Sequence, residues 1–391
     1  MSRFSSSIAA LLVALLVAWQ LHFRQYLAAI GVGRSVESIG NTNCKTVPEL
    51  QACEKIVLHQ PTGTIYLACS TLRDRVQWMP AVNKLNASGT SGNDHIATYD
   101  PQTNAVRHLS LSGFSSPGGL FVHGMDVVAS IHDPSILYVY VVNHRKPISG
   151  DPRKIGADSV IEVFQTQTGG SELKYIRTFE DPAVVITPND VVGSPDGQSV
   201  YFTNDNSQKL GLKRHLNLFI QPSDTSVGFC HVDHGCKFAF RGLHASNGIV
   251  KGFNQNNDTF YVADYMLGEI TVLEKRPDNT LAFIEVIKTG YAADNLAVDS
   301  NGALWVAVLS DLLGLIYRKF DDPSQLVASA ALRVTVNNGP SSFYGEKYNV
   351  DKVFEDPGNL ASGITSAVYD SERGQLFLHG VISTHLTVCR L

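Results

Sequence analysis

Three asparagines and one aspartate are spaced so that their side-chain oxygens could meet around one ion. Asn189, Asn247 and Asn295 each open a short apolar run, and Asp294 directly precedes Asn295. Ca²⁺ takes about 6 to 8 oxygen ligands, whereas Zn²⁺ favours the nitrogen and sulfur of His and Cys. The pattern therefore predicts a calcium site. The competing interpretation is that these residues only form Asx turns before strands.

A recurring hairpin explains how residues so far apart would meet. Six similar apolar cores, GTIYLA, SILYVY, QSVYFT, DTFYVA, GALWVA and GQLFLH, end at residues 68, 140, 203, 263, 307 and 379. A turn and another short β-run lie ahead of each core, and further strand pairs fill the intervals. Four short strands repeated about six times indicate a β-propeller. A sandwich would not require six similar hairpins in series.

In a propeller the inner strand of each blade lines the central channel, so oxygens at the entry of several inner strands converge on the axis. We therefore predict an all-β fold, a six-bladed β-propeller over residues 31–391. Residues 1–30 are predicted to form an N-terminal hydrophobic signal or anchor helix.

The N-terminal segment and the overall charge restrict the classes of function. An apolar run from Ile8 to Trp19 follows Arg3 and is typical of a secretory signal. Its extension to Ile30 would make it a retained anchor in contact with a membrane or lipid surface; a buried core helix is the third interpretation. We expect a secreted or membrane-anchored protein. The net charge of −5 argues against nucleic-acid binding.

The cysteines and sequons fit that compartment. Six cysteines suit an oxidising environment. Cys230 and Cys236 flank the loop CHVDHGC, which would be closed by a disulfide or would bind a metal through its histidines. Asn86 and Asn257 stand in glycosylation sequons.

An ordered set of motifs resembles the paraoxonase/arylesterase family, calcium-dependent lactonases with a six-bladed propeller that are related to gluconolactonase-like propellers. The motifs are VHGMDV, YVVNHR, NDVVG, FTND, SNGI, DNLAVD and the terminal LTVCRL. The resemblance runs over nearly the whole chain.

The resemblance implies two calcium ions and a set of residue roles. The catalytic ion would be bound by Asn189, Asn247, Asp294 and Asn295. A second, structural ion would be bound by Asp190 and the backbone of Met125. His123 would activate a water, His144 would orient it, and Asp205 would lie near this pair. Cys44 and Cys389 would form the disulfide that joins the terminal strands.

The chain also departs from the family pattern. The family has a Glu-Asp pair that gives one carboxylate to each calcium ion, and we align that pair with Cys53 and Glu54 in the segment ACEK. Only Glu54 would then serve as a ligand, so one of the two sites would be short of a carboxylate. Alternatively, Cys53 is bonded to Cys69. A pocket histidine of the family is replaced here by Leu309.

Together these features predict a calcium-dependent hydrolase of lactones and aryl esters, in which the metal polarises the carbonyl and a histidine activates water. The sequence contains no GxSxG nucleophile motif. Two alternatives stay open: a non-catalytic, calcium-stabilised propeller that acts as a binding module, and a propeller enzyme of another chemistry, such as a sugar lactonase or a synthase.

Overall fold

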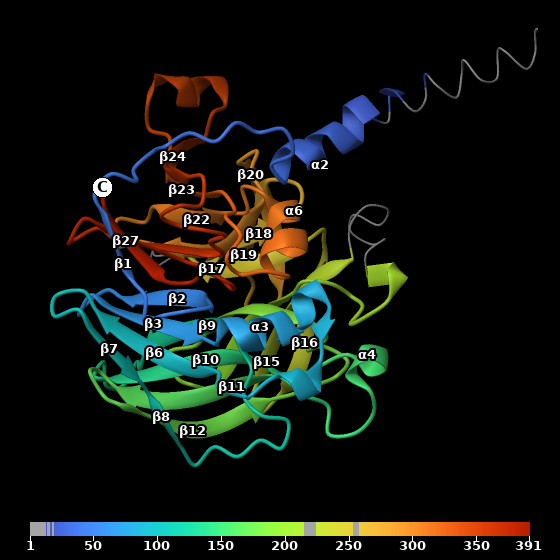
Figure 1. Ribbon diagram of the computed structural model, residues 1–391, viewed down its shortest axis with the longest axis vertical. Coiled ribbons are helices and arrows are strands. Elements are labelled where there is room, and N and C mark those ends of the chain that lie inside the picture. The colour runs from blue at the N-terminus through green and yellow to red at the C-terminus, as the bar shows by residue number, and fades with distance from the viewer. Residues whose placement is uncertain (1–12, 14–15, 18, 215–223, 253–257) are drawn as a thin grey trace, which may run out of the picture.

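Six antiparallel sheets form the blades of the propeller (Figure 1). The computed structural model describes residues 13, 16–17, 19–214, 224–252 and 258–391. The first three blades consist of β2 (Cys53–His59), β3 (Thr64–Cys69), β6 (His95–Asp100) and β7 (Ala105–His108); β9 (Val122–Ala129), β10 (Ile136–Arg145), β11 (Asp158–Gln167) and β12 (Glu172–Phe179), with β8 (Ser110–Ser112) added at the edge; and β13 (Pro188–Gly193), β14 (Ser199–Asn204), β15 (Thr225–His231) and β16 (Gly235–Leu243).

The last three blades complete the ring. They consist of β17 (Ser246–Lys251), β18 (Thr259–Asp264), β19 (Glu269–Lys275) and β20 (Leu281–Lys288); β21 (Ala293–Val298), β22 (Leu304–Val308), β23 (Ser329–Val336) and β24 (Tyr348–Asp356); and β25 (Ser366–Asp370), β26 (Gln375–His379), β27 (Leu386–Arg390) and β1 (Cys44–Val47). The inner strands β2, β9, β13, β17, β21 and β25 contact one another in that cyclic order. The predicted six-bladed propeller is confirmed.

The first and last strands close the sixth blade. β1 pairs antiparallel with β27, and the register sets Cys44 opposite Cys389; the two strands lie side by side in Figure 1. The predicted disulfide between these cysteines is present. In the chain-entropy account, a cross-link that closes so long a loop stabilises the fold by about 6 kcal/mol.

The core lies between successive blades. Each interface is filled by buried apolar side chains of the two facing sheets. Between the fifth and sixth blades, for example, the buried Trp305 ring stacks on Tyr369 at a centroid distance of 4.3 Å. This packing makes the inner strands a fixed frame for any site on the axis.

Short helices and loops cover one end of the channel. They comprise α3 (Leu72–Gln77), β4 (Trp78–Met79), η2 (Pro80–Val82), β5 (Lys84–Leu85), η3 (Ala87–Gly89), α6 (Leu312–Gly314) and η4 (Leu315–Lys319). Two other short helices are α4 (Pro152–Ile155) and η5 (Pro340–Tyr344).

The N-terminal helices η1 (Trp19–Phe23) and α2 (Arg24–Ala29) lead into this same end. Tyr26 and Ile30 are buried in the apolar cluster there, and the Ala292 amide donates to the Ala29 carbonyl. Within the described residues, no helix is long and apolar enough to cross a membrane. The role predicted for residues 1–30 as a signal or an anchor stays a prediction.

Candidate functional site

The polar residues on the axis come from β-bulges at one level of five inner strands. In β13, Pro188 pairs with Asn204 and Val191 with Phe202, so that two residues, Asn189 and Asp190, face a single one. The same irregularity occurs in β2, β9, β17 and β21. A bulge bends its strand and redirects side chains, which is why bulges are common beside active sites.

The bulges arrange the residues in two tiers along the channel. The first bulge residues, here called the upper tier, are Glu54, His123, Asn189, Asn247 and Asp294; the second ones, the lower tier, are Lys55, Gly124, Asp190, Gly248 and Asn295. The register thus makes Asp294 the equivalent of Asn189 and Asn247, and it corrects the prediction that Asn295 holds that position.

All five residues of the upper tier line one cavity at the helix-covered end. The cavity measures ≈ 1200 Å³ with its open mouth included. Its walls are mostly apolar and include Ile30, Met79, Leu309, Leu312, Leu315 and Phe320. The site is therefore a polar floor beneath an apolar chamber, which is a usual form for a small-molecule site.

The floor presents buried oxygens that lack hydrogen-bond donors. Within the described part of the chain, Glu54 Oε2, Asn189 Oδ1 and Asn247 Oδ1 have no hydrogen-bond partner. A buried acceptor without a partner costs about 1 to 3 kcal/mol, and more if it is charged. A cation bound among them would remove that cost, so the donor set fits Ca²⁺.

The charges of the axial cluster support the same conclusion. Burial, and then the nearby Asp190 carboxylate, raises the pKa of the Glu54 carboxyl. Burial and Glu54 raise the pKa of Asp294 well above its usual range. The carboxylates of Glu54, Asp190 and Asp294 lie close to one another, and the Lys55 ammonium is 2.6 Å from Asp190. Arg75 is a further positive group near Glu54, and Asp126 is another buried carboxylate near Lys55 and Asp190. A bound divalent cation would reduce the repulsion among these carboxylates.

The two predicted histidines lie side by side, with His123 lining this cavity and His144 lining a smaller neighbouring one. The rings of His123 and His144 are 5.1 Å apart, edge to face. His123 Nε2 accepts from the Asn189 amide at 3.2 Å, and His144 Nδ1 bonds the Ser159 hydroxyl at 2.8 Å. Burial lowers the pKa of His123 well below its usual value and that of His144 to about 3. Both rings are therefore neutral at pH 7.

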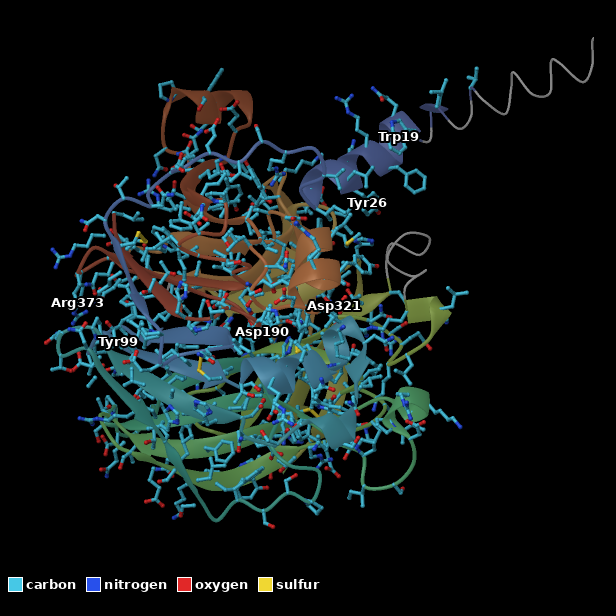
Figure 2. All side chains as sticks on the ribbon, viewed as in Figure 1. Trp19, Tyr26, Tyr99, Asp190, Asp321 and Arg373 are labelled. Carbon is cyan, nitrogen blue, oxygen red and sulfur yellow. A yellow bond between two sulfur atoms is a disulfide. The ribbon has the colours of Figure 1, made fainter. Side chains whose placement is uncertain are left out.

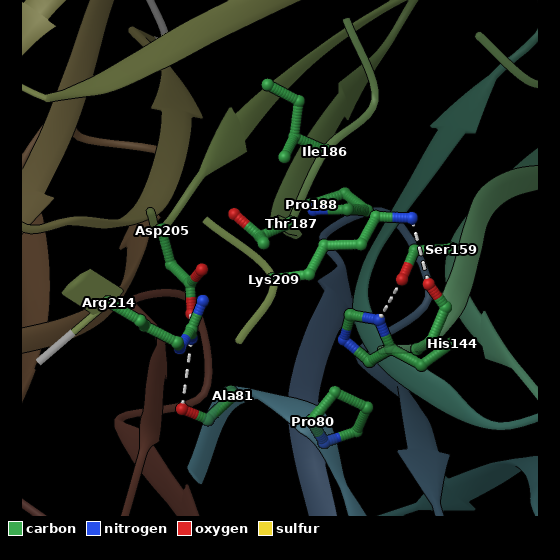
Figure 3. A pocket seen from close by; sticks show the side chains of 11 residues that line it. Pro80, Ala81, His144, Ser159, Ile186, Thr187, Pro188, Asp205, Lys209 and Arg214 are labelled. Carbon is green, nitrogen blue, oxygen red and sulfur yellow. Dashed lines mark hydrogen bonds and ion pairs between the residues drawn. The ribbon is translucent and has the colours of Figure 1, made fainter. Parts of the chain in front are cut away.

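Asp205 lines the same small cavity as His144 and is paired with an arginine. Its Oδ2 accepts from Arg214 at 2.7 Å, and both side chains are buried. This pair borders the main cavity and a smaller neighbouring one of ≈ 290 Å³, shown in Figure 3, which His144 also lines. Arg214, missed in the sequence, balances the Asp205 charge at the boundary of the two cavities.

Lys55 occupies the lower tier, and the ligand position predicted for Cys53 has to be corrected. Cys53 forms a disulfide with Cys69, so it is not a degenerate ligand. The two residues that the bulge of β2 brings to the axis are Glu54, which lines the upper cavity, and Lys55, which lines the channel on the far side. Met125 lines that far side as well.

The remaining candidate residues are placed as follows. Cys230 and Cys236 form a disulfide, and the rings of His231 and His234 stack within the loop that it closes. Asn86 is exposed, as a glycosylation site requires, whereas Asn257 lies outside the described residues. Glycosylation stays a prediction. Among the described residues no group of three or more His, Cys, Asp and Glu side chains is arranged for a metal ion; half of the oxygen donors proposed here are amides.

Comparison with known proteins places this architecture in a family. The rat serum paraoxonase/arylesterase 2 is 24% identical over 92% of this chain and 91% of its own. The human serum paraoxonase/lactonase 3 is 24% identical over 88% of both chains. Among solved structures, a gluconolactonase from Xanthomonas campestris covers 92% of this chain and 99% of its own, with 13% identity and a TM-score of 0.49. The arylesterase family model matches residues 35–391. This chain belongs to the arylesterase family.

Proposed function

We propose that this protein hydrolyses lactones and aryl esters with a calcium ion bound at the upper tier. The observation that carries the proposal is the set of buried oxygens without hydrogen-bond donors at the floor of an apolar cavity. The names of the relatives, arylesterase and lactonase, point to the same class of substrate.

Glu54, Asn189, Asn247 and Asp294 would hold the ion. When bound, calcium would supply a Lewis acid that polarises the ester carbonyl. The Asn295 oxygen, which the family resemblance also assigns to this ion, turns instead toward Lys55, and its amide nitrogen donates to Glu54. Asn295 would thus position Glu54 rather than bind the metal.

His123 is the base of the proposed reaction because it borders the main cavity, whereas His144 does not. A water in the cavity would replace the Asn189 N–H at Nε2 and give its proton to that nitrogen. His144, held by Ser159, packs edge to face on the His123 ring and fixes its orientation. A positioned base is commonly worth about 10² to 10⁴ in rate.

The apolar walls favour substrates with an aryl or alkyl group. Burial of such a group against the leucines of the chamber would fix the carbonyl over the polar floor. Asp205 and Arg214 form a charged part of the wall. We assign them to substrate orientation rather than proton transfer, because the guanidinium lies 2.7 Å from the carboxylate.

The test is the turnover of phenyl acetate and of a simple lactone by wild type and Asn247→Ala, with calcium or a chelator present. We expect the wild type to lose activity in chelator and Asn247→Ala to be inactive in calcium. The matched control is Asn301→Ala, an exposed asparagine away from the site, which should behave as wild type. Calcium-independent turnover contradicts the proposed mechanism, and calcium binding without turnover of either substrate favours the binding-module alternative.

A further inference from the structure

Lys55 is buried on the channel axis, where it meets two other blades. Only 5% of Lys55 is exposed, and Asp190 is fully buried; Asp190 lies near the middle of the molecule in Figure 2. The Lys55 ammonium lies 2.6 Å from Asp190 Oδ2, 3.3 Å from Asn295 Oδ1 and 3.3 Å from the Leu296 carbonyl. A lysine ammonium has three N–H donors, and each has an acceptor here.

These contacts join alternate blades around the axis. Lys55 belongs to β2 in the first blade, Asp190 to β13 in the third, and Asn295 to β21 in the fifth. Asp190 Oδ2 also accepts from the Ile249 amide of β17 in the fourth. A positive charge at this point therefore links strands that do not pair with one another.

The lower tier already holds a cation: Asp190 Oδ2 and Asn295 Oδ1 both accept from the Lys55 ammonium, and Asp190 Oδ1 is the lower-tier oxygen left without a hydrogen-bond partner among the described residues. Two positions of the lower tier are glycines because the neighbouring backbone is close. A Cβ at Gly124 would lie 2.2 Å from the Asn189 carbonyl oxygen, and one at Gly248 would lie 2.6 Å from that of Asp294. The two calcium ions implied by the family resemblance thus do not both fit this chain.

We infer that the Lys55 ammonium is a built-in cation that takes the place of a second metal ion, so that the chain binds one calcium ion rather than two. Only the ion at the upper tier rests on the proposed function. The charges around Lys55 agree with this inference: the ammonium already offsets the buried Asp190 carboxylate, whereas an acid at position 55 would add another carboxylate in its place.

The first test is the stoichiometry of bound calcium in the wild-type protein, measured by equilibrium dialysis and mass spectrometry of the metal. We expect one ion per chain, and two per chain in Lys55→Asp. Two ions in the wild type overturn the inference. So does a folded Lys55→Asp that binds no more calcium than wild type.

The second test is thermal unfolding in chelator, which does not depend on the upper ion. Lys55→Met leaves Asp190 buried without its counter-charge, and removal of one partner from a buried pair is strongly destabilising, so we expect a melting temperature about 5 to 10 °C lower. The control is Lys347→Met, which removes a lysine paired with Glu285 at the surface and should change the melting temperature little.

The outcomes separate this inference from the proposed function. A wild type that binds no calcium but is destabilised by Lys55→Met contradicts the calcium mechanism and supports the role of Lys55. A Lys55→Met protein as stable as wild type in chelator overturns that role, whatever the activity. If Lys55→Asp does not fold, the calcium stoichiometry of the wild type and the melting temperature of Lys55→Met still test the inference.

Discussion

Adjacent residues of one strand serve two separate environments at the axis. Glu54 faces the apolar cavity, where one of its oxygens has no hydrogen-bond donor, and Lys55 faces the opposite side of the channel. Asn295 contacts both, since its amide nitrogen donates to Glu54 and its oxygen accepts from Lys55. The side-chain amide of Asn295 therefore connects the Lys55 ammonium to the Glu54 carboxylate.

Glu54→Gln should weaken calcium binding by at least about 10- to 100-fold, the loss usually seen even for residues that only support a ligand. In wild type the affinity should rise with pH, because burial raises the pKa of the Glu54 and Asp294 carboxyls and calcium must displace their protons. Titration calorimetry at several pH values measures both effects, and Glu54→Gln should show a smaller change with pH.

The control for this variant is Glu162→Gln. Glu162 is also buried, but its oxygens accept from Asn143 and Thr178 away from the cavity. Loss of this carboxylate should alter stability and leave calcium affinity unchanged. Equal affinities in Glu54→Gln and wild type would exclude Glu54 as a ligand.

At the scale of the element, the β-bulge is the unit that builds the site. Each bulge contributes one side chain to the upper tier and one residue to the lower tier, so a strand without it would turn one of them away from the axis. The sixth inner strand, β25, pairs regularly with β26 from Ser366 onward. It contributes Thr365 to the cavity wall, just before the strand begins.

Gly248→Ala should disturb the site without changing the side chain of any proposed ligand. The new Cβ would lie 2.6 Å from the Asp294 carbonyl oxygen, so β17 and β21 would have to move apart. We expect lower calcium affinity and a lower melting temperature, both measurable by calorimetry. Gly252→Ala is the matched control, because its Cβ would meet its nearest neighbour at an ordinary 3.5 Å. Unchanged affinity in Gly248→Ala would show that the bulge tolerates displacement.

For the whole molecule, buried neutral histidines make the fold sensitive to acid. His379 is fully buried, Nε2 bonds the Leu50 carbonyl, and Nδ1 accepts from the Gly380 amide. Burial lowers its pKa from 6.5 to about 4. The unfolded chain binds this proton first as pH falls, so the stabilisation is complete above pH 6.5 and is lost toward pH 4.

The free energy of unfolding should therefore fall less in His379→Gln than in wild type when the pH is lowered from 7.5 to 4.5. We expect a difference of up to roughly 3 kcal/mol. Urea unfolding at several pH values measures this dependence. His132→Gln, at an exposed position, should retain the wild-type slope. A His379→Gln protein with the wild-type slope would assign the acid sensitivity to other groups.

Much of the architecture could be predicted because it repeats. Six hairpin cores predicted six blades, and paired Asn and Asp residues before strands predicted a polar axis. The division of the axial residues into two tiers could not be predicted. It depends on the positions of β-bulges, which residue type does not specify. Sequence reasoning gave Cys53 a ligand position. It therefore assigned no role to Lys55, which the bulge of β2 brings to the axis. The disulfide partner of Cys53 became certain only when β2 and β3 were seen to pair.

Ring closure also has a consequence for biosynthesis. Cys44 leaves the ribosome well before its partner Cys389, which lies 345 residues later in the chain. Cys53 and Cys69 emerge soon after Cys44, and a thiolate exchanges readily with any disulfide that it can reach. During synthesis Cys44 must therefore remain reduced or be held in a temporary pairing. The last blade, and with it the ring of inner strands, is completed only after β27 has been synthesised.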